Sequence, residues 1–425
     1  MTPPRGPVHI DVPRDFLYEL TNYERVLLDQ FMPARSGFAS PKQVVEVSEL
    51  LLSSKRPVIL AGGACVSKEA SPLVEELSRL LQAPLMTTYS HNDAIRSDYD
   101  LSMGSIGREG SEAAMRIYSK ADLVLALGTR LEDFTFNPYY GFDFSKPDAK
   151  IIQVTLNLQD IGRSRKIDLG IVAEVTAFLE QLIFEHKKKG SVELGHSRQQ
   201  YVDEAIQAKN AWKKHIAEIK GSTKLPIMQE VYSALRKVLP EDAVITLDVG
   251  SSPSFAYGLL EYHKPKSLLS PSPLGGLGFA IPAAIGAKLA EPTRPVYALL
   301  GDGAFTMEIP ALITAIEYDI PINLLVFDNG SWGAEKNFQD AAYNSRYVGT
   351  ILKNPDLSKL SATLGANTET VEAREGLEGV MRKVFAHQGV NVLVAKVDPD
   401  TFPPRRDATP PERGIFKQSA QHSNF

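Results

Sequence analysis

The 425-residue sequence has a single cysteine, Cys65, so it cannot form a disulfide bond within the chain. A lone cysteine is typical of proteins from reducing compartments. No run of apolar residues approaches the roughly 18 that a membrane-spanning helix needs, and residues 1–7 lack the apolar core of a signal peptide. These absences argue against a disulfide-stapled secreted protein and a helical membrane protein, and we expect a cytoplasmic location.

The sequence also lacks an excess of positive charge. Its net charge is −5, whereas nucleic-acid-binding proteins usually carry a basic surface. Charged residues make up 23% and hydrophobic residues 43% of the chain, as in ordinary globular proteins. We therefore expect a small-molecule substrate, with neither nucleic acid nor membrane as a partner, and a chain of this length predicts two or three domains.

Short apolar runs alternate with helical patterns in two regions, which is typical of doubly wound parallel sheets. We therefore predict an α/β fold with two such domains, at 41–190 and 225–398. The first has helices at 42–53, 67–81, 110–119 and 171–187 and strands at 57–61, 84–88, 122–128 and 151–155; the second has helices at 226–238, 253–262, 307–318, 355–364 and 374–387 and strands at 243–248, 296–300, 322–327 and 390–397.

Three further segments complete the predicted organisation. Residues 1–40 contain a strand at 6–13, where apolar and polar residues alternate, and a linker punctuated by prolines. Residues 191–224 are a polar, mostly helical linker, and residues 399–425 are an irregular tail.

Oxygen-bearing residues follow two neighbouring strands of the second domain. Gly301-Asp302-Gly303 follows the strand 296–300, and Asn329 follows the strand 322–327. Ligands of open α/β sheets bind at these carboxyl ends, and a carboxylate, an amide oxygen and a backbone carbonyl suit Mg²⁺ held together with phosphates. The helix that follows Gly303 favours an anion at its N-terminus. The alternative is that Gly301-Asp302-Gly303 is only a turn between strand and helix.

Other glycine clusters are weaker signals. Gly62-Gly63 and the segment 104–107 do not form the Gly-x-Gly-x-x-Gly pattern of dinucleotide-binding folds, so we expect them to serve turns. Flavin binding to the first domain stays open. A third strand end, at 249–252, carries small and hydroxyl-bearing residues that would face the predicted site.

The stretch 296–332, together with the glycine-rich loop 275–286, resembles the diphosphate-binding domain of the thiamine diphosphate (ThDP)-dependent decarboxylase and carboligase superfamily. The resemblance implies ThDP and Mg²⁺ as cofactors, and a middle domain before the diphosphate-binding domain. It implies Asp302, Asn329 and the carbonyl of Ser331 as metal ligands. Asp328 departs from the Asn that is common before the ligand Asn. The implied cofactor-binding residues are Ser251, Gly276, Leu277, Gly301, Asp302, Gly303, Ala304, Asn329, Ser331 and Trp332.

In this superfamily a pyrimidine-binding domain with an activating glutamate precedes the middle domain. Residues 6–13 are similar to the last strand of that domain, so we expect about 150 residues to be missing upstream. No glutamate of this chain has that context, and its catalytic residues are therefore unknown. We expect a homo-oligomer, or a partner chain that supplies the missing domain.

The segments 332–337, 343–348 and 404–408 are similar to superfamily members that transfer an acetyl group from a sulfonated aldehyde to phosphate. Two anionic substrates need cations, for which Lys336, Arg346, Arg405 and Arg406 are candidates. The alternatives are a carboligase or decarboxylase similar to acetolactate synthase, and a non-catalytic ThDP-binding fragment or subunit.

Overall fold

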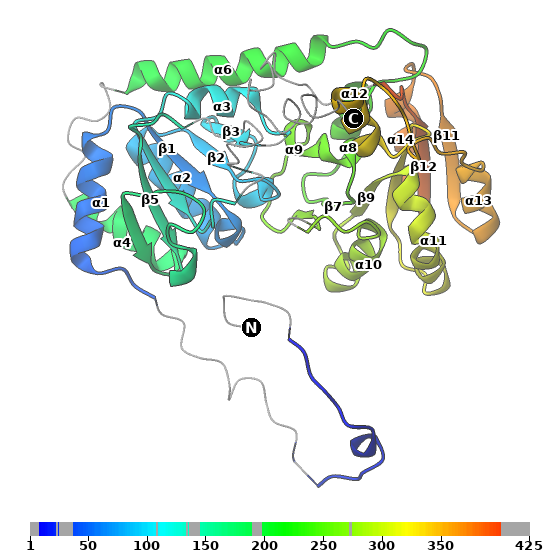
Figure 1. Ribbon diagram of the computed structural model, residues 1–425, viewed down its shortest axis with the longest axis horizontal. Coiled ribbons are helices and arrows are strands. Elements are labelled where there is room, and N and C mark those ends of the chain that lie inside the picture. Colours follow the sequence, from blue (N-terminus) through cyan, green and yellow to red (C-terminus); the bar gives the residue numbers. More distant parts are fainter. Residues whose placement is uncertain are drawn as a thin grey trace, which may run out of the picture.

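The structure is a computed structural model that describes residues 8–22, 24, 37–107, 109–132, 135, 145–188, 198–271 and 274–400. Two six-stranded sheets occupy the two halves of the molecule, and helices cover both faces of each (Figure 1). The strand pairs of both sheets are parallel. The predicted α/β fold with two doubly wound parallel sheets is therefore confirmed.

The first sheet has the strand order β3-β2-β1-β4-β5-β6. Its central strands β1 and β4 are buried along their whole length, as a parallel sheet covered on both faces requires. Helices α1, α2 and α4 pack on one face, and α3 and α6 on the other. The bounds are α1 Pro41–Ser53, β1 Pro57–Ala61, α2 Ala70–Leu81, β2 Leu85–Thr87, β3 Ser102–Ser105, α3 Glu112–Tyr118, β4 Leu123–Leu127, β5 Lys150–Thr155, β6 Leu169–Val172, α4 Val175–Lys188 and α6 Gln199–Glu218.

The second sheet has the order β11-β12-β10-β9-β7-β8. Helices α7, α9 and α14 pack on one face, and α10, α11 and α13 on the other. The chain reverses its direction of winding between β7 and β9, so the carboxyl ends of these strands flank a crevice. The bounds are α7 Met228–Val238, β7 Val244–Leu247, α8 Ser251–Ser254, α9 Ala256–Leu259, β8 Leu268–Leu269, α10 Ala280–Ala290, β9 Val296–Gly301, α11 Asp302–Glu317, β10 Asn323–Asp328, α12 Gly333–Tyr343, α13 Leu357–Leu364, β11 Asn367–Val371, α14 Leu377–Phe385 and β12 Asn391–Lys396.

Helix α6 runs over the first domain toward the second (Figure 1), and a buried arginine anchors its start. Arg198 is 1% exposed and donates hydrogen bonds to the carbonyls of Leu81, Leu51 and Ser54 at 2.5–2.6 Å. These carbonyls lie at the C-terminal ends of α2 and α1, where no intrahelical donor remains. The arginine therefore ties three helices of the first domain together.

The strand expected at 6–13 is wrong for the residues that the structure describes. Residues 8–13 form no strand, and Val8, Ile10 and Val12 are 83%, 74% and 58% exposed. A strand is held by hydrogen bonds to a neighbouring strand, and no strand in the described part of the chain pairs with this segment. An alternation of apolar and polar residues is therefore not sufficient to form a strand. Residues 6 and 7 lie outside the described residues, as do 401–425 of the predicted tail.

Two helices of the structure have other bounds than those predicted from the sequence. The helix expected at 171–187 starts at Val175, because 169–172 form strand β6 beside β5. The helix expected at 253–262 is divided into α8 and α9 and ends at Leu259. Tyr262 instead exchanges hydrogen bonds with Ser97 of the first domain, and this pairing holds 260–262 out of the helix.

None of the helices in the described part of the chain combines the length and the apolar composition that a membrane span needs.

Replacing Arg198 by leucine is expected to lower the free energy of unfolding by about 2–4 kcal/mol, because it leaves buried helix-end carbonyls without donors. Urea unfolding followed by circular dichroism measures the change. Arg163→Leu is the matched control, since the Arg163 side chain is 65% exposed and its nearest carboxylate oxygen lies at 3.9 Å. Equal effects of the two substitutions would contradict the anchoring role.

Candidate functional site

The crevice between β7 and β9 is bordered by side chains at the ends of three strands, among them the predicted Ser251, Asp302 and Asn329. Strand β7 leads into Asp248 and then Ser251, and β9 leads into Asp302. The neighbouring strand β10 ends at Asp328 and leads into Asn329. Parallel pairing of these strands therefore brings oxygen-bearing residues from three sequence regions to one edge of the sheet.

Two carboxylates share one amide donor at this edge. Asn354 Nδ2 donates to Asp302 Oδ2 at 2.6 Å and to Asp328 Oδ1 at 3.0 Å. Asp302 is 1% exposed, and burial raises its pKa to about 7, with the charge of Asp328 adding to the rise. Within the described ranges neither carboxylate forms an ion pair with a lysine or arginine. The pair is an uncompensated concentration of negative charge.

The loop after β10 is held against Asp302. The N–H of Gly330 donates to Asp302 Oδ2 at 2.9 Å. The amide oxygen of Asn329 accepts from the N–H of Ser331 at 3.1 Å and from its hydroxyl at 3.2 Å. The structure thus brings the expected ligand loop to Asp302, while Asn329 Oδ1 is turned toward its own loop. Among the described residues no group of three or more His, Cys, Asp or Glu side chains could hold a metal, so a cation here would need amide and carbonyl oxygens.

Three helices begin at this edge. Ser251, Asp302 and Gly333 are the first residues of α8, α11 and α12. A Cβ atom at Gly303 would lie 2.6 Å from the Trp332 ring, and one at Gly333 would lie 2.3 Å from Ser251 Oγ. The helix starts are therefore packed closely enough that only glycine fits between them. The N–H groups and the dipoles of helix N-termini favour an anion, so this edge suits a phosphate group next to a cation.

The start of α11 also corrects one expectation. The sequence analysis placed a turn at 301–303 and began the helix at 307. The helix starts directly at Asp302, and Gly301 has a φ of −77°, which any residue can adopt. The first turn of α11 therefore begins at the strand end itself, and its Ala304 is buried in the core.

The glycine-rich loop before α10 is anchored to the same edge by Asp248. Its carboxylate is 4% exposed and accepts from the N–H groups of Gly278, Phe279 and Ala280 at 3.3, 2.7 and 2.9 Å. A Cβ atom at Gly276 would meet nothing within 4 Å. Leu277 is 41% exposed, so it does not belong to the core and is available for contact with a ligand.

A second acid lies beneath this loop. Glu308 is 3% exposed, its Oε2 accepts from the N–H of Ile281, and its Oε1 has no donor in the protein. Burial raises the pKa of Glu308 to about 9, and hydrogen bonding with Asp248 adds to the rise. Glu308 therefore retains its proton at neutral pH, which lets the carboxyl face Asp248 without repulsion between two charges.

The cations that were predicted to bind substrate are not brought together at this edge. Lys336 is 5% exposed, and its ammonium group lies 2.7 Å from Asp400 Oδ1 and 3.9 Å from Asp340 Oδ2. The cation is thus already paired with carboxylates of its own chain. Arg346 is exposed, while Arg405 and Arg406 lie outside the described residues. A role in binding substrate stays a prediction for all four.

The sequence analysis missed Asp248, Glu308 and Asn354. Asp248 follows a strand just as Asp302 does, so the same strand-end rule could have found it. Glu308 lies in a helical pattern and Asn354 in a loop. No spacing rule connects Asn354 to a carboxylate 52 positions away.

The proton on Glu308 predicts a pH dependence of stability. The pKa is about 9 in the folded state against an ordinary 4.5, so between these values the folded state binds more protons and stability falls as pH rises. Glu308→Gln mimics the protonated acid and should reduce this loss, which amounts to at most about 1.4 kcal/mol per pH unit. Unfolding of both proteins in urea at pH 5 to 9 measures it. Parallel pH profiles would be contrary to this expectation, and Glu317→Gln, on the exposed end of α11, is the control.

Comparisons with known proteins agree with this geometry. The family model described as thiamine pyrophosphate enzyme, central domain, matches residues 44–182, and that described as thiamine pyrophosphate enzyme, C-terminal TPP binding domain, matches residues 248–395. The second range contains the whole crevice edge, from Asp248 to Asn354.

Curated relatives have similar sequences over most of the chain. Sulfoacetaldehyde acetyltransferase of Alcaligenes xylosoxydans xylosoxydans is 32% identical over 90% of this chain and 66% of its own length. A protein of Rhizobium meliloti named probable sulfoacetaldehyde acetyltransferase is 31% identical over 95% of this chain and 71% of its own. The probable acetolactate synthase large subunit of Methanocaldococcus jannaschii is 29% identical over 93% and 67%. The chain spans about two thirds of the length of these relatives. It belongs to the thiamine pyrophosphate, or thiamine diphosphate, enzyme family.

Proposed function

We propose that the chain binds ThDP and Mg²⁺ at the crevice edge of the second sheet. The observation that carries the proposal is the pair formed by the buried Asp302 and the half-buried Asp328, which has no cationic side chain beside it in the described structure. A divalent cation supplies the missing positive charge, and Mg²⁺ prefers carboxylate, amide and carbonyl oxygens shared with phosphates. In this proposal Asp302, Asn329 and the Ser331 carbonyl hold the ion, for which Asn329 Oδ1 turns away from Ser331.

The starts of the three helices would receive the diphosphate. Gly303 lies against Trp332 there, and Gly333 lies against Ser251. N–H groups at helix starts neutralise phosphate oxygens. Gly276 and Leu277 lie on the exposed loop that Asp248 anchors, from where Leu277 can contact the ring system of the cofactor. The residues present therefore fit both the anionic and the apolar parts of ThDP.

The activity that we propose is transfer of an acetyl group from sulfoacetaldehyde to phosphate, which yields acetyl phosphate and sulfite. Bound ThDP supplies a carbanion that attacks a carbonyl carbon and an electron sink for the electrons released. The chain's own part is to orient the cofactor and to exclude water around it. The first-named relatives, at 31–32% identity, support this reaction, and Arg346 is the exposed cation closest in sequence to the site loop that could pair with a sulfonate or phosphate.

A partner domain is part of the proposal. The relatives are longer than this chain, and we infer that the acid that activates ThDP comes from a pyrimidine-binding domain outside it. Apolar side chains on the loop 274–277 and on helices α10 and α11 are exposed and could contact that domain or a second copy; they are Leu274, Leu277, Leu289, Met307 and Ile313. Sedimentation of the chain as a monomer at all concentrations would argue against self-association.

Removal of the proposed metal ligand tests cofactor binding directly. Calorimetry should show ThDP binding only with Mg²⁺ present, and Asp302→Ala should weaken it at least about 100-fold, the usual loss when a charge-assisted contact is removed from a buried site. Asp319→Asn, at the exposed end of α11, should leave the affinity within about twofold. Unchanged affinity of a folded Asp302→Ala variant would rule out this ligand set.

Product analysis tests the reaction. The chain, ThDP and Mg²⁺ are incubated with sulfoacetaldehyde and phosphate, or with pyruvate, with and without the part of the Alcaligenes relative that this chain does not match. We expect sulfite with acetyl phosphate, and at least about 100-fold less without that part, because general acid–base catalysis contributes about 10²–10⁴ in rate. Full activity of the chain alone contradicts the partner proposal.

The same assay separates the alternatives. Acetolactate from pyruvate, without sulfite release, would identify a carboligase similar to acetolactate synthase. The 29% identity to the Methanocaldococcus protein supports this alternative. ThDP binding without product under any condition would identify a non-catalytic ThDP-binding subunit.

A further inference from the structure

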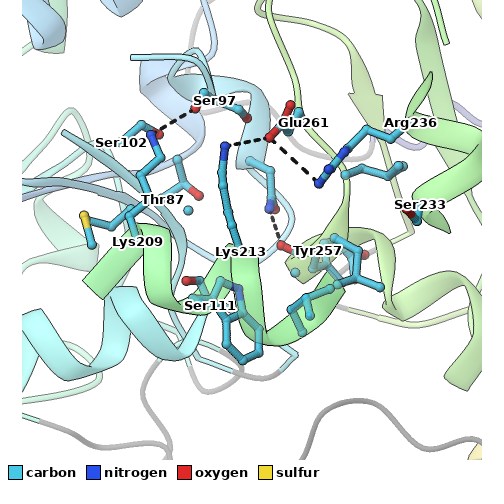
Figure 2. A pocket seen from close by; sticks show the side chains of 18 of the residues that line it. Thr87, Ser97, Ser102, Ser111, Lys209, Lys213, Ser233, Arg236, Tyr257 and Glu261 are labelled. Atoms are coloured by element: carbon cyan, nitrogen blue, oxygen red, sulfur yellow. Dashed lines mark hydrogen bonds and ion pairs between the residues drawn. The ribbon is translucent and has the colours of Figure 1, made fainter. Parts of the chain in front are cut away.

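A second cavity lies between the two domains, away from the crevice edge. Its walls come from the first domain around β3, from α6, and from α7 and α9 of the second domain (Figure 2). Its volume is about 110 Å³, several times what one water needs. None of the residues predicted for the cofactor lines it. β3, which contributes Ser102, Met103 and Gly104 to the lining, is an edge strand that pairs only with β2 in the described structure.

Three buried polar side chains of the wall lack hydrogen-bond partners. Thr87 Oγ1, Asn92 Oδ1 and Gln229 Oε1 find no partner among the residues that the structure describes, and the three residues are only 2%, 7% and 5% exposed. Asn92 Nδ2 donates to the carbonyl of Tyr257 at 2.7 Å, which fixes the amide so that its oxygen is the free atom. A buried acceptor without a donor is costly. These atoms therefore call for hydroxyl or N–H groups from a molecule in the cavity.

The opposite part of the lining is cationic. Lys213 of α6 and Arg236 of α7 both face the carboxylate of Glu261, at 2.9 and 3.9 Å (Figure 2). Burial opposes ionisation of Glu261, but the hydrogen bond and charge of Lys213 and the charge of Arg236 outweigh it and lower the pKa of Glu261. One carboxylate neutralises only one of the two cations, so this part of the lining retains a positive charge.

A second lysine connects the wall to the first domain. Lys209 Nζ donates to the carbonyls of Tyr99 at 2.8 Å and Ser97 at 3.3 Å, next to the start of β3. Its ammonium group is therefore used in holding α6 to the first domain. Trp212, on the same helix, adds an aromatic surface to the lining. The cavity thus combines a fixed polar wall, an apolar surface and a positive side.

We propose that this interdomain cavity binds a small hydroxylated organic anion, with its carboxylate or phosphate at Lys213 and Arg236 and its hydroxyl groups at Thr87, Asn92 and Gln229. An inorganic ion has no donors for three separate acceptors. Because both domains and α6 contribute walls, an occupant stabilises their arrangement. The proposal does not depend on ThDP, since its site is separate.

Binding is measured on the full chain without ThDP or Mg²⁺, by thermal unfolding and calorimetry. The probes are glycerol 3-phosphate, 3-phosphoglycerate and D-glycerate, each with an anionic group and at least one hydroxyl. Inorganic phosphate and glycerol are the controls that carry only one of the two features. We expect at least one probe to bind at least about tenfold more tightly than either control, the effect of one additional charged hydrogen bond. If no probe exceeds both controls, the proposal is overturned.

Variants locate the binding. Thr87→Val and Gln229→Met remove the unpartnered oxygens with little change of shape, and Lys213→Met removes a cation; each should weaken probe binding about tenfold. Lys214→Met is the matched control, because Lys214 is the neighbouring lysine of α6, its side chain is 77% exposed and it does not line the cavity. Its affinity should stay within about twofold.

The variants also distinguish a ligand from trapped water. If water alone fills the cavity, Thr87→Val and Gln229→Met shift the unfolding temperature but leave the affinity for every probe as it was in the unaltered chain. That result, or an equal loss of affinity in Lys214→Met, overturns the proposal. Loss of affinity in the three cavity variants alone supports it.

Discussion

The buried carboxylate of Asp302 constrains the whole second domain. It starts α11, lies next to Asp328, and accepts hydrogen bonds from the N–H groups of Gly303, Gly330 and the Asn354 side chain. Burial and the neighbouring charge of Asp328 disfavour ionisation of Asp302 and raise its pKa to about 7. A cation beside the pair, as in the proposed metal site, would favour the charged form. Hydrogen bonds to Asp302 connect the loops that carry Asn329 and Asn354 to the start of α11.

The surrounding parts follow from the same sheet edge. Parallel strands place their carboxyl ends and the starts of the following helices together, so positive helix ends lie next to the carboxylates that need a cation. Asp248 anchors the glycine-rich loop there, and a protonated Glu308 lets a second acid lie beneath it. In the proposed site a phosphate would bind the positive helix starts and a metal ion the carboxylates, so each would reduce the repulsion around the other.

The sequence predicts the parts of this structure that depend on local chemistry. The central strands were predicted because they are buried on both faces and read as continuous apolar runs. The four strands that were missed, β3, β6, β8 and β11, are the edge strands of the two sheets, and each has at least one partly exposed residue. Asp302 and Asn329 were predicted together because both follow strands. Asn354 and the pairing of Lys336 with Asp400, 64 positions away, depend on tertiary packing, which no local pattern encodes.

A crystal structure of the chain with ThDP and Mn²⁺ in place of Mg²⁺ would test the central claim most directly, because the anomalous signal of manganese locates the ion. The account predicts one strong peak at about 2.1–2.2 Å from Asp302, Asn329 Oδ1 and the Ser331 carbonyl, close to the distances of Mg²⁺ sites, with the diphosphate against the starts of α8, α11 and α12. ThDP bound without a peak at Asp302, or a peak elsewhere in the chain, would contradict it.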